Sequence, residues 1–197
     1  MSIRRLMRQN RTIVLLPCFE IAGVLQVLGG TSASPIYAPL SAPTSAILNT
    51  WASITAYGGP GIGGNISGAV LDTVKLGLGA SATENTLLIT SVGNEVTATL
   101  TKVNASFGFM RDLNPTDTGA FNLAWQLTRV PDIRYVIADR IMGGKNSNAA
   151  FAASDVVDFY DVRTDNGIDV PADQKFTTFT QAFVPTGLVN PNYTLGS

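Results

Sequence analysis

Alternation of apolar and polar residues with a period of two is the feature of this sequence that most restricts its fold. In the run EVTATLTKV, Glu95–Val103, the apolar side chains fall on one side of the chain and the threonines on the other. A period of two is typical of a strand with one buried face. The run is preceded by TLLITSV, Thr86–Val92, and the two are separated only by Gly93-Asn94. Two such runs with a Gly-Asn pair between them predict a tight β-hairpin.

Three further runs of this kind follow: DIRYVIADRIM (132–142), DVVDFYDVRT (155–164) and KFTTFTQAFV (175–184). Before them lies a segment with helical spacing, bounded by Pro115 and Pro131, in which Phe121, Ala124 and Trp125 fall at i, i+3 and i+4. These three residues are the predicted core face of a helix over about 117–128. The segment Ile47–Tyr57 is compatible with a strand. The expected fold is mainly β: two packed antiparallel β-sheets, sandwich-like or barrel-like, with one flanking α-helix.

The N-terminal region combines a basic start, MSIRRLMRQN, with the apolar stretch RTIVLLPCFEIAGVLQVLGG. Pro17, Glu20 and Gln26 interrupt the stretch, which makes it a poor membrane span and a poor signal peptide. We therefore expect no membrane anchoring. RTIVLLPC is interpreted as a strand, and FEIAGVLQVLGG as a strand or a short helix. The stretch as a whole is predicted to be an apolar arm that lies on another subunit, with contacts through Ile13, Leu15, Leu16, Phe19 and Leu25.

Composition excludes several classes of function. The chain has no histidine, so histidine-based acid–base catalysis and most zinc sites are excluded. Its single cysteine, Cys18, cannot form a disulfide within the chain. Only 14% of the residues are charged and the formal net charge is −1, which gives no basic footprint for tight binding of nucleic acid. Low charge favours a surface that is covered by partners. We expect no enzyme, cofactor or metal site.

Two local patterns invite a ligand interpretation. The loop Gly58–Gly64 matches the spacing of a dinucleotide fingerprint, but no helical pattern follows it, so a mobile loop is the better interpretation. Aspartates crowd the region 155–173, where a solvated or pore-facing acidic strip is favoured over a cation site or a glycosidase pair.

The order of segments from Ala120 to Leu188 resembles that in a known family. A helix (AFNLAWQLT) precedes a strand with Arg140 and a glycine pair (DIRYVIADRIMGGK); then come AFAASDVVDFYDVRTD and VPADQKFTTFTQAFVPTG. Near the other end, SAPTSAILN fits the same pattern. This arrangement is similar to the tail tube proteins of long-tailed, non-contractile bacteriophages, especially those that infect actinobacteria. Residues 1–40 and 58–85 match the family pattern less well.

The resemblance implies that the protein has a structural role in a virion. In such proteins two packed sheets are flanked by a helix, and hexameric rings stack into a tube around a tape-measure protein. The inner sheets of the copies join into one barrel through which DNA passes, and tail-tip and terminator proteins complete the tail. We thus expect a virion protein that is assembled in the host cytoplasm. Its expected divisions are an arm with the first strand (1–40), a β-sandwich domain (41–188) and a C-terminal tail (189–197).

Within this interpretation two groups of residues acquire roles. The glycine loop is a candidate contact between rings, through Gly58, Gly59, Gly61, Gly63 and Gly64. The aspartates are candidates for an acidic lining that would repel DNA phosphates, and the residues are Asp155, Asp158, Asp161 and Asp165.

Two other classes remain open at this stage. One is another virion component with a similar β fold, such as a tail terminator, a head–tail connector or a capsid decoration protein. The other is an exported β-sandwich binding module.

Overall fold

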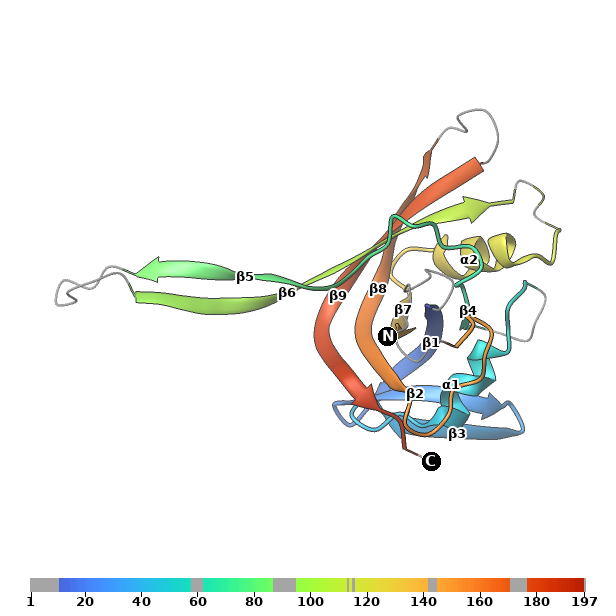
Figure 1. Ribbon diagram of the computed structural model, residues 1–197, viewed down its shortest axis with the longest axis horizontal. Coiled ribbons are helices and arrows are strands. Elements are labelled where there is room, and N and C mark those ends of the chain that lie inside the picture. Colours follow the sequence, from blue (N-terminus) through green and yellow to red (C-terminus); the bar gives the residue numbers. More distant parts are fainter. Residues whose placement is uncertain are drawn as a thin grey trace, which may run out of the picture.

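The computed structural model of the chain describes residues 11–57, 62–86, 95–112, 114, 116–141, 145–170 and 177–196 (Figure 1). The fold is mainly β and antiparallel, as predicted. Its elements are β1 (Thr12–Ile21), β2 (Val24–Thr31), β3 (Ser34–Pro39), α1 (Ser45–Ala52), β4 (Gly64–Asn65), β5 (Lys75–Thr86), β6 (Glu95–Arg111), α2 (Ala120–Thr128), β7 (Arg134–Arg140), β8 (Val156–Val170) and β9 (Thr177–Thr194).

The strands follow one path, in the order β3-β2-β1-β7-β8-β9-β6-β5, with β4 paired to β1. β1 connects two sheets: its first half pairs with β4 and β7, and Cys18–Ile21 pairs with β2. The turn between β1 and β2 consists of Ala22 and Gly23, with φ of 49° and 78°. Positive φ at both central residues is the signature of a turn that matches the twist of a tight hairpin. RTIVLLPC is thus a strand, as expected, and the segment after it forms a second strand rather than a helix.

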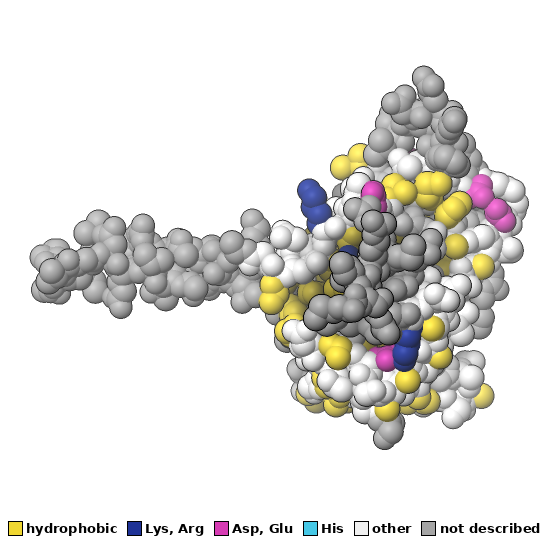
Figure 2. All heavy atoms as spheres, in the orientation of Figure 1, with side chains coloured by type: hydrophobic (Ala, Val, Ile, Leu, Met, Phe, Trp, Pro, Cys, Tyr) yellow, Lys and Arg dark blue, Asp and Glu magenta, His cyan; other side chains and the backbone are white. Residues whose placement is uncertain are grey.

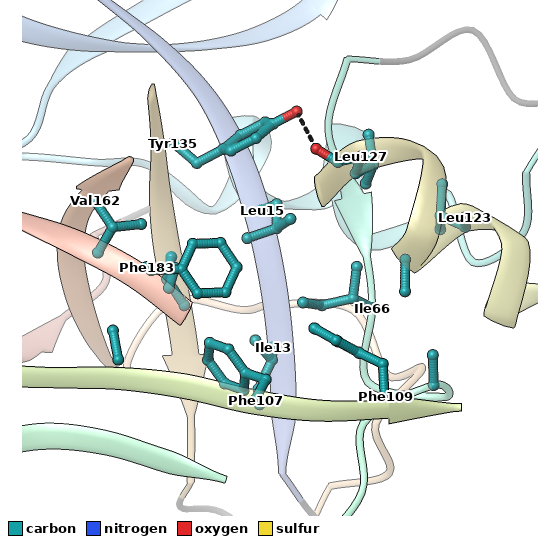
Figure 3. Close-up of a cluster of buried hydrophobic side chains, with 14 of the residues drawn as sticks. Ile13, Leu15, Ile66, Phe107, Phe109, Leu123, Leu127, Tyr135, Val162 and Phe183 are labelled. Atoms are coloured by element: carbon teal, nitrogen blue, oxygen red, sulfur yellow. Dashed lines mark hydrogen bonds between the residues drawn. The ribbon is translucent and has the colours of Figure 1, made fainter. Parts of the chain in front are cut away.

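The inner core lies on the face of the sheet that carries the odd-numbered residues of β1 and β7 (Figure 3). Here the strands curl until the segment after β4 bridges β1 and β6. Ile66 N–H donates to the Ile13 carbonyl at 3.0 Å, and Met110 N–H donates to the Ala69 carbonyl at 2.8 Å. The result is barrel-like, with α2 closing one side. The aromatic side chains buried in this core are Phe107, Phe109, Tyr135, Tyr160, Phe179 and Phe183.

The outer core lies on the opposite face of the same strands. Val14 and Leu16 of β1 point into it, together with Val136 of β7, and β2 and α1 cover them. Because successive side chains of a strand alternate between its two faces, β1 supplies apolar residues to both cores. This double burial explains the uninterrupted apolar run Ile13–Leu16, which is buried throughout.

The segment that was predicted to be compatible with a strand forms helix α1 instead, so that prediction is wrong. Thr44 caps the helix, because its Oγ1 accepts a hydrogen bond from Ile47 N–H at 3.4 Å. Ile47, Leu48 and Trp51 share the buried face, and the Trp51 indole Nε1–H donates to the Leu28 carbonyl at 2.5 Å. The i, i+1, i+4 spacing of these residues is a helical signal. The protein therefore has two flanking helices rather than one among its described residues.

Helix α2 is shorter than predicted and buries a different face. It begins at Ala120 after Gly119, not after Thr116 or Asp117. Ala124 is fully buried and Trp125 is partly buried, but Phe121 is 36% exposed, so its assignment to the core is wrong. The face that packs on the inner core is formed instead by Leu123, Ala124 and Leu127, with Asn122 and Thr128 at its borders. The Leu127 carbonyl accepts a hydrogen bond from the Tyr135 hydroxyl at 3.0 Å (Figure 3).

Strands β5 and β6 form a hairpin that projects from the body (Figure 1). Glu95 pairs with Thr86, whereas a two-residue turn at Gly93-Asn94 would pair Glu95 with Val92. The predicted register is therefore wrong, and the turn itself lies outside the described residues. In the part of the chain that the structure describes, β6 pairs with β9 from Ser106 to Arg111. The rest of the hairpin is a two-stranded ribbon.

Candidate functional site

The predicted acidic strip is not a free surface, because two of its carboxylates form ion pairs within the subunit. Asp161 is buried and accepts two hydrogen bonds from the guanidinium of Arg134, at 3.0 and 2.8 Å. Asp155 accepts from Lys145 Nζ at 2.6 Å and from Arg140 Nη1 at 3.1 Å. The assignment of Asp155 and Asp161 to a repulsive lining is therefore corrected: their charges are neutralised inside the subunit.

The other two aspartates of the strip also have local partners. Asp158 accepts from the Asn192 amide at 2.6 Å, and Asp165 accepts from the Asn166 amide at 2.7 Å. Asp158 lies on the same face of β8 as Tyr160, and Asp161 lies on the face of Phe159. The strand therefore turns its aspartates to opposite faces, and they do not form one continuous acidic lining.

Arg140 is the centre of the most extensive buried polar cluster. Its side chain has no exposed surface, and it lies over the ring of Phe151 at 4.4 Å. Besides Asp155, its guanidinium donates to Thr12 Oγ1 at 3.0 Å and to backbone carbonyls of the β7–β8 connection, which belong to Asn146, Ala149 and Ala150. The sequence indicated Arg140 only as part of a family pattern. The structure shows that it fastens the β7–β8 connection to the end of β1.

A second buried pair lies beside this cluster. Arg11 donates two hydrogen bonds to Asp139, at 2.9 and 2.5 Å, and Asp139 is 1% exposed. Burial raises the pKa of Asp139, and the hydrogen bonds and charge of Arg11 oppose that rise. This ion pair joins the start of β1 to β7. In the described part of the chain no three His, Cys, Asp or Glu residues are placed to hold a metal ion.

The glycine loop is divided between two settings. Gly58, Gly59 and Gly61 lie outside the described residues. Gly63 and Gly64 are buried, and Gly64 pairs with Leu15 of β1. A Cβ on Gly63 would lie 2.5 Å from the Leu15 carbonyl oxygen. The role of Gly63 and Gly64 as a contact between rings is therefore corrected, because they are needed where β4 lies against β1.

The predicted arm contacts are also mostly internal. Ile13 and Leu15 belong to the inner core, and Leu16 and Leu25 to the outer core. These four side chains are not available to another subunit, because β1 is a central strand and not an arm. Phe19 alone of the five is half-buried, and its ring meets Tyr37 edge-on at 5.4 Å. At the other terminus, the predicted tail begins inside β9, and Leu195 is buried.

The remaining surface is apolar in places and sparsely charged. Ile21, Val24, Ile36 and Tyr37 are exposed around the β1–β3 end of the sheet, and Leu78, Ile168 and Val184 are exposed on β5, β8 and β9. On the face shown in Figure 2, the charged side chains that are drawn in colour are few and scattered. A surface of this kind is typical of contacts with other protein chains.

A shallow cavity of about 420 Å³ lies between the β1–β2 turn, the end of β3 and β9. Its walls carry apolar groups, a hydroxyl and amides but no acidic or basic side chain; they are formed by Gly23, Val24, Leu25, Pro39, Leu40, Ser41, Val189 and Asn190. The cavity therefore has no side chain that could act in acid–base catalysis. None of the described helices is long and apolar enough to cross a membrane.

Comparison with known proteins gives one match. A family model described as "Phage tail tube protein" matches residues 35–197. The matched region starts in β3 and leaves out β1 and β2. The chain has no significant match among curated proteins or solved structures.

Proposed function

Because the chain belongs to the phage tail tube protein family, we propose that its copies form hexameric rings that stack into the tube of a long, non-contractile tail. The tube conducts DNA during infection. The protein acts structurally rather than as an enzyme, and it resides in the virion after assembly in the host cytoplasm. Its partners in the tail are tape-measure, tail-tip and terminator proteins.

The projecting β5–β6 hairpin is the observation that most strongly supports assembly. Among the described residues, β6 pairs with β5 alone from Glu95 to Ala105, since its pairing with β9 begins at Ser106. A two-stranded hairpin is at best marginally stable in water without a surface to pack on. A ribbon of this length therefore needs a partner, and a neighbouring copy supplies one in every subunit of a tube.

The hairpin takes over the role first assigned to the glycine loop. It leaves the body on one side (Figure 1), whereas Gly63 and Gly64 are enclosed by β1 and α1. In the proposed tube the hairpin of one subunit lies on another subunit. The surface that receives the hairpin on the neighbouring subunit is not that subunit's own hairpin, so the contact is head-to-tail. Such a contact closes into a ring or repeats along an axis.

Low charge supports the same assembly. Charged residues make up 14% of the chain, compared with about a quarter in typical globular domains. Moreover, some of the charged side chains, such as Asp161 and Arg140, form ion pairs inside the subunit. Little like-charge repulsion then opposes the packing of many identical copies.

Negative-stain electron microscopy of the purified chain tests the proposal. We expect six-fold rings and tubes. The informative variant replaces residues 80–101 by Asn-Gly, which joins the paired residues Gly79 and Lys102 by a two-residue turn. This variant should keep the circular dichroism of the folded body but remain a monomer of about 19 kDa, compared with 20.8 kDa for the full chain.

A matched control introduces the same Asn-Gly turn into a different hairpin. Ala22→Asn creates Asn-Gly in the β1–β2 turn, where φ is already positive, and should assemble normally. A wild-type chain that stays monomeric at high concentration would overturn the proposal. Wild-type rings that never stack would favour a terminator or connector instead.

A further inference from the structure

Strand β8 contains a bulge between Thr164 and Gly167, where its pairing register with β9 shifts. Two residues of β8, Asp165 and Asn166, lie there opposite one residue of β9, Ala182. The backbone N–H of Asn166 donates to the carboxylate of Asp165 at 2.7 Å, and the Asn166 side chain is exposed. The carboxamide of Asn166 therefore lies at the surface, in an irregular part of the strand.

The residue that follows this asparagine is a glycine, and Asn166-Gly167 is the only Asn-Gly pair in the sequence. The side-chain carbonyl of an asparagine and the backbone nitrogen of the next residue can close a five-membered ring. A Cβ on that next residue hinders the approach of the nitrogen, and glycine has none. At Gly167 an added Cβ would also lie 3.1 Å from Oε1 of Gln181, whose side chain is buried. Internal packing thus favours a glycine here, directly after an exposed asparagine.

The backbone N–H of Gly167 points away from β9. Met110 N–H donates to the Ala69 carbonyl on one side of β6, so the odd-numbered residues of β6 bond to β9 on the other side. By the register, Ile168 then bonds to Thr180 of β9, and the backbone groups of Gly167 turn to the side of β7. Among the described residues, the pairing of β8 with β7 has already ended before this point. The Gly167 nitrogen is therefore not engaged by a strand in the described part of the chain.

We propose that Asn166 is a site of spontaneous deamidation in the folded protein. The backbone nitrogen of Gly167 attacks Cγ of Asn166, and the new N–Cγ bond closes a succinimide ring. The Cγ–Nδ2 bond breaks, and the side-chain nitrogen leaves as ammonia, gaining one proton while Gly167 loses one. Water then opens the ring at either of its two carbonyls, which leaves aspartate or isoaspartate at position 166. Water is the only co-reactant, and nothing is oxidised or reduced.

The bulge and the unpaired side of β8 allow this reaction without global unfolding. The Gly167 nitrogen must approach Cγ of Asn166 to about 3–3.5 Å for the attack, which requires a local change in the dihedral angles of Asn166. In a strand that is paired on both sides, such a change breaks hydrogen bonds between strands. Here the bulge already interrupts the ladder on one side, and on the other side Gly167 has no strand partner among the described residues. A local opening is therefore sufficient.

The modification changes both charge and backbone. Each conversion adds one negative charge to a chain whose formal net charge is −1. Isoaspartate also lengthens the main chain by one methylene group, at the bulge. This inference concerns the folded chain itself and does not depend on the proposed assembly.

Peptide mass spectrometry of the folded, full-length chain, aged at mildly alkaline pH, tests the inference. Trypsin releases residues 164–175, in which Asn166 is the only asparagine, and residues 146–163, which contain Asn146 and Asn148. All three asparagines are exposed, but serine and alanine follow the other two. The second peptide is therefore a matched control within the same digest. A sample digested without ageing gives the deamidation that occurs during digestion.

We expect Asn166 to gain the mass of an amide-to-acid conversion at least about tenfold faster than Asn146, because only Asn166 precedes a residue without a Cβ. In isoelectric focusing, the aged chain should acquire a more acidic species that migrates with unaged Asn166→Asp.

Two variants test the ring closure. Asn166→Gln places the carbonyl one methylene further away, so the ring would have six members, and the aged variant should keep its amide. Gly167→Ala should slow the reaction by about tenfold, because its methyl group shields the nitrogen. Circular dichroism checks that Gly167→Ala folds beside Gln181. If it does not, Asn166→Gln still tests the mechanism, since its side chain is exposed.

Ageing in urea distinguishes a reaction of the folded chain from a reaction of a small unfolded fraction. We expect the rate at Asn166 in the folded chain to lie within about tenfold of the rate in urea, because a local opening suffices. A lower rate in the folded chain, or conversion of Asn146 as fast as that of Asn166, would overturn the inference. Either result would leave the proposed function unaffected.

Discussion

Arg140, which has no exposed surface, donates a hydrogen bond from Nη1 to Asp155 Oδ2 at 3.1 Å across the β7–β8 connection. The carboxylate is also held by Lys145, and the guanidinium by Thr12 at the start of β1. One ion pair thus joins the connection to two strands of the barrel-like sheet. Its burial makes it sensitive to the loss of either partner.

Asp155→Ala should destabilise the fold by about 3–5 kcal/mol, because it leaves the buried Arg140 guanidinium without its counter-charge. Urea unfolding followed by circular dichroism measures the change. Arg163→Ala is the control: Arg163 pairs with Asp132, whose side chain is 80% exposed, and such a pair contributes about 0–1 kcal/mol. Equal effects of the two substitutions would contradict the assigned importance of the buried pair.

The contribution of Asp155 should depend on pH. Burial alone would raise its pKa, but hydrogen bonds from Lys145, the Ala152 amide and Arg140 outweigh burial and hold the pKa below its usual 3.8. The stabilisation is therefore present above about pH 4 and is lost as pH falls through the lowered pKa of the folded state. We expect the difference in unfolding free energy between the wild type and Asp155→Asn to shrink below pH 4.

Asp139 provides the opposite case for the same titration. Burial raises its pKa despite the nearby Arg11, so its ionised form is less favourable in the folded protein than in the unfolded chain. As pH falls through the raised pKa, the wild type should gain stability relative to Asp139→Asn. If the stability of the wild type relative to each variant changed in the same direction as pH falls, for Asp139→Asn and for Asp155→Asn, one of the two pKa directions would be wrong.

Gly63→Ala should disrupt the contact between β4 and β1. The new Cβ would lie 2.5 Å from the Leu15 carbonyl oxygen and 2.7 Å from Pro17 Cδ, so backbone must move, at a cost of about 1–3 kcal/mol. At Gly68 the nearest atom to a new Cβ is 3.4 Å away, and Gly68→Ala should change stability little. Thermal unfolding of the two variants compares them directly, and a neutral Gly63→Ala would refute the close approach.

The buried face of α2 can be checked with a pair of truncations. Leu123→Ala removes a side chain that is 3% exposed and should cost about 2–5 kcal/mol. Phe121→Ala removes a larger side chain that is 36% exposed and should cost about 1 kcal/mol or less. If Phe121→Ala proved the more damaging in urea unfolding, the helix would be rotated from the orientation described.

Local patterns were sufficient for the type of most elements and for part of the helix. The alternation in β6 and β8 predicted strands, and Ala124 was assigned to the core correctly. The rotation of α2 was not predictable from spacing alone, because Phe121 and Leu123 are both apolar and only the packing of the helix on the inner core decides which one is buried. For α1, the Thr44 cap and the spacing of Ile47, Leu48 and Trp51 are helical signals in the sequence itself.

The functional surface was less predictable than the fold. The glycine loop, the apolar N-terminal stretch and the aspartates were each interpreted from composition, and each has described members that are buried or paired within the subunit. Gly64 pairs with Leu15, and Asp161 pairs with Arg134; in both pairs the partners lie far apart in the sequence. Spacing along the chain contains no information on such partners.

By itself, the sequence determined that this chain would be mainly β, antiparallel, sparsely charged and without histidine chemistry, because these properties follow from the period of side chains along each strand and from composition. Only the tertiary structure decided that β1 lies in the middle of the sheet, that Arg140 and Asp155 face each other, and that Gly63 and Gly64 are buried where β4 lies against β1. The physical reason is that strand pairing and ion pairing are non-local. Which backbone and charged groups stay free depends on what the rest of the chain has already covered.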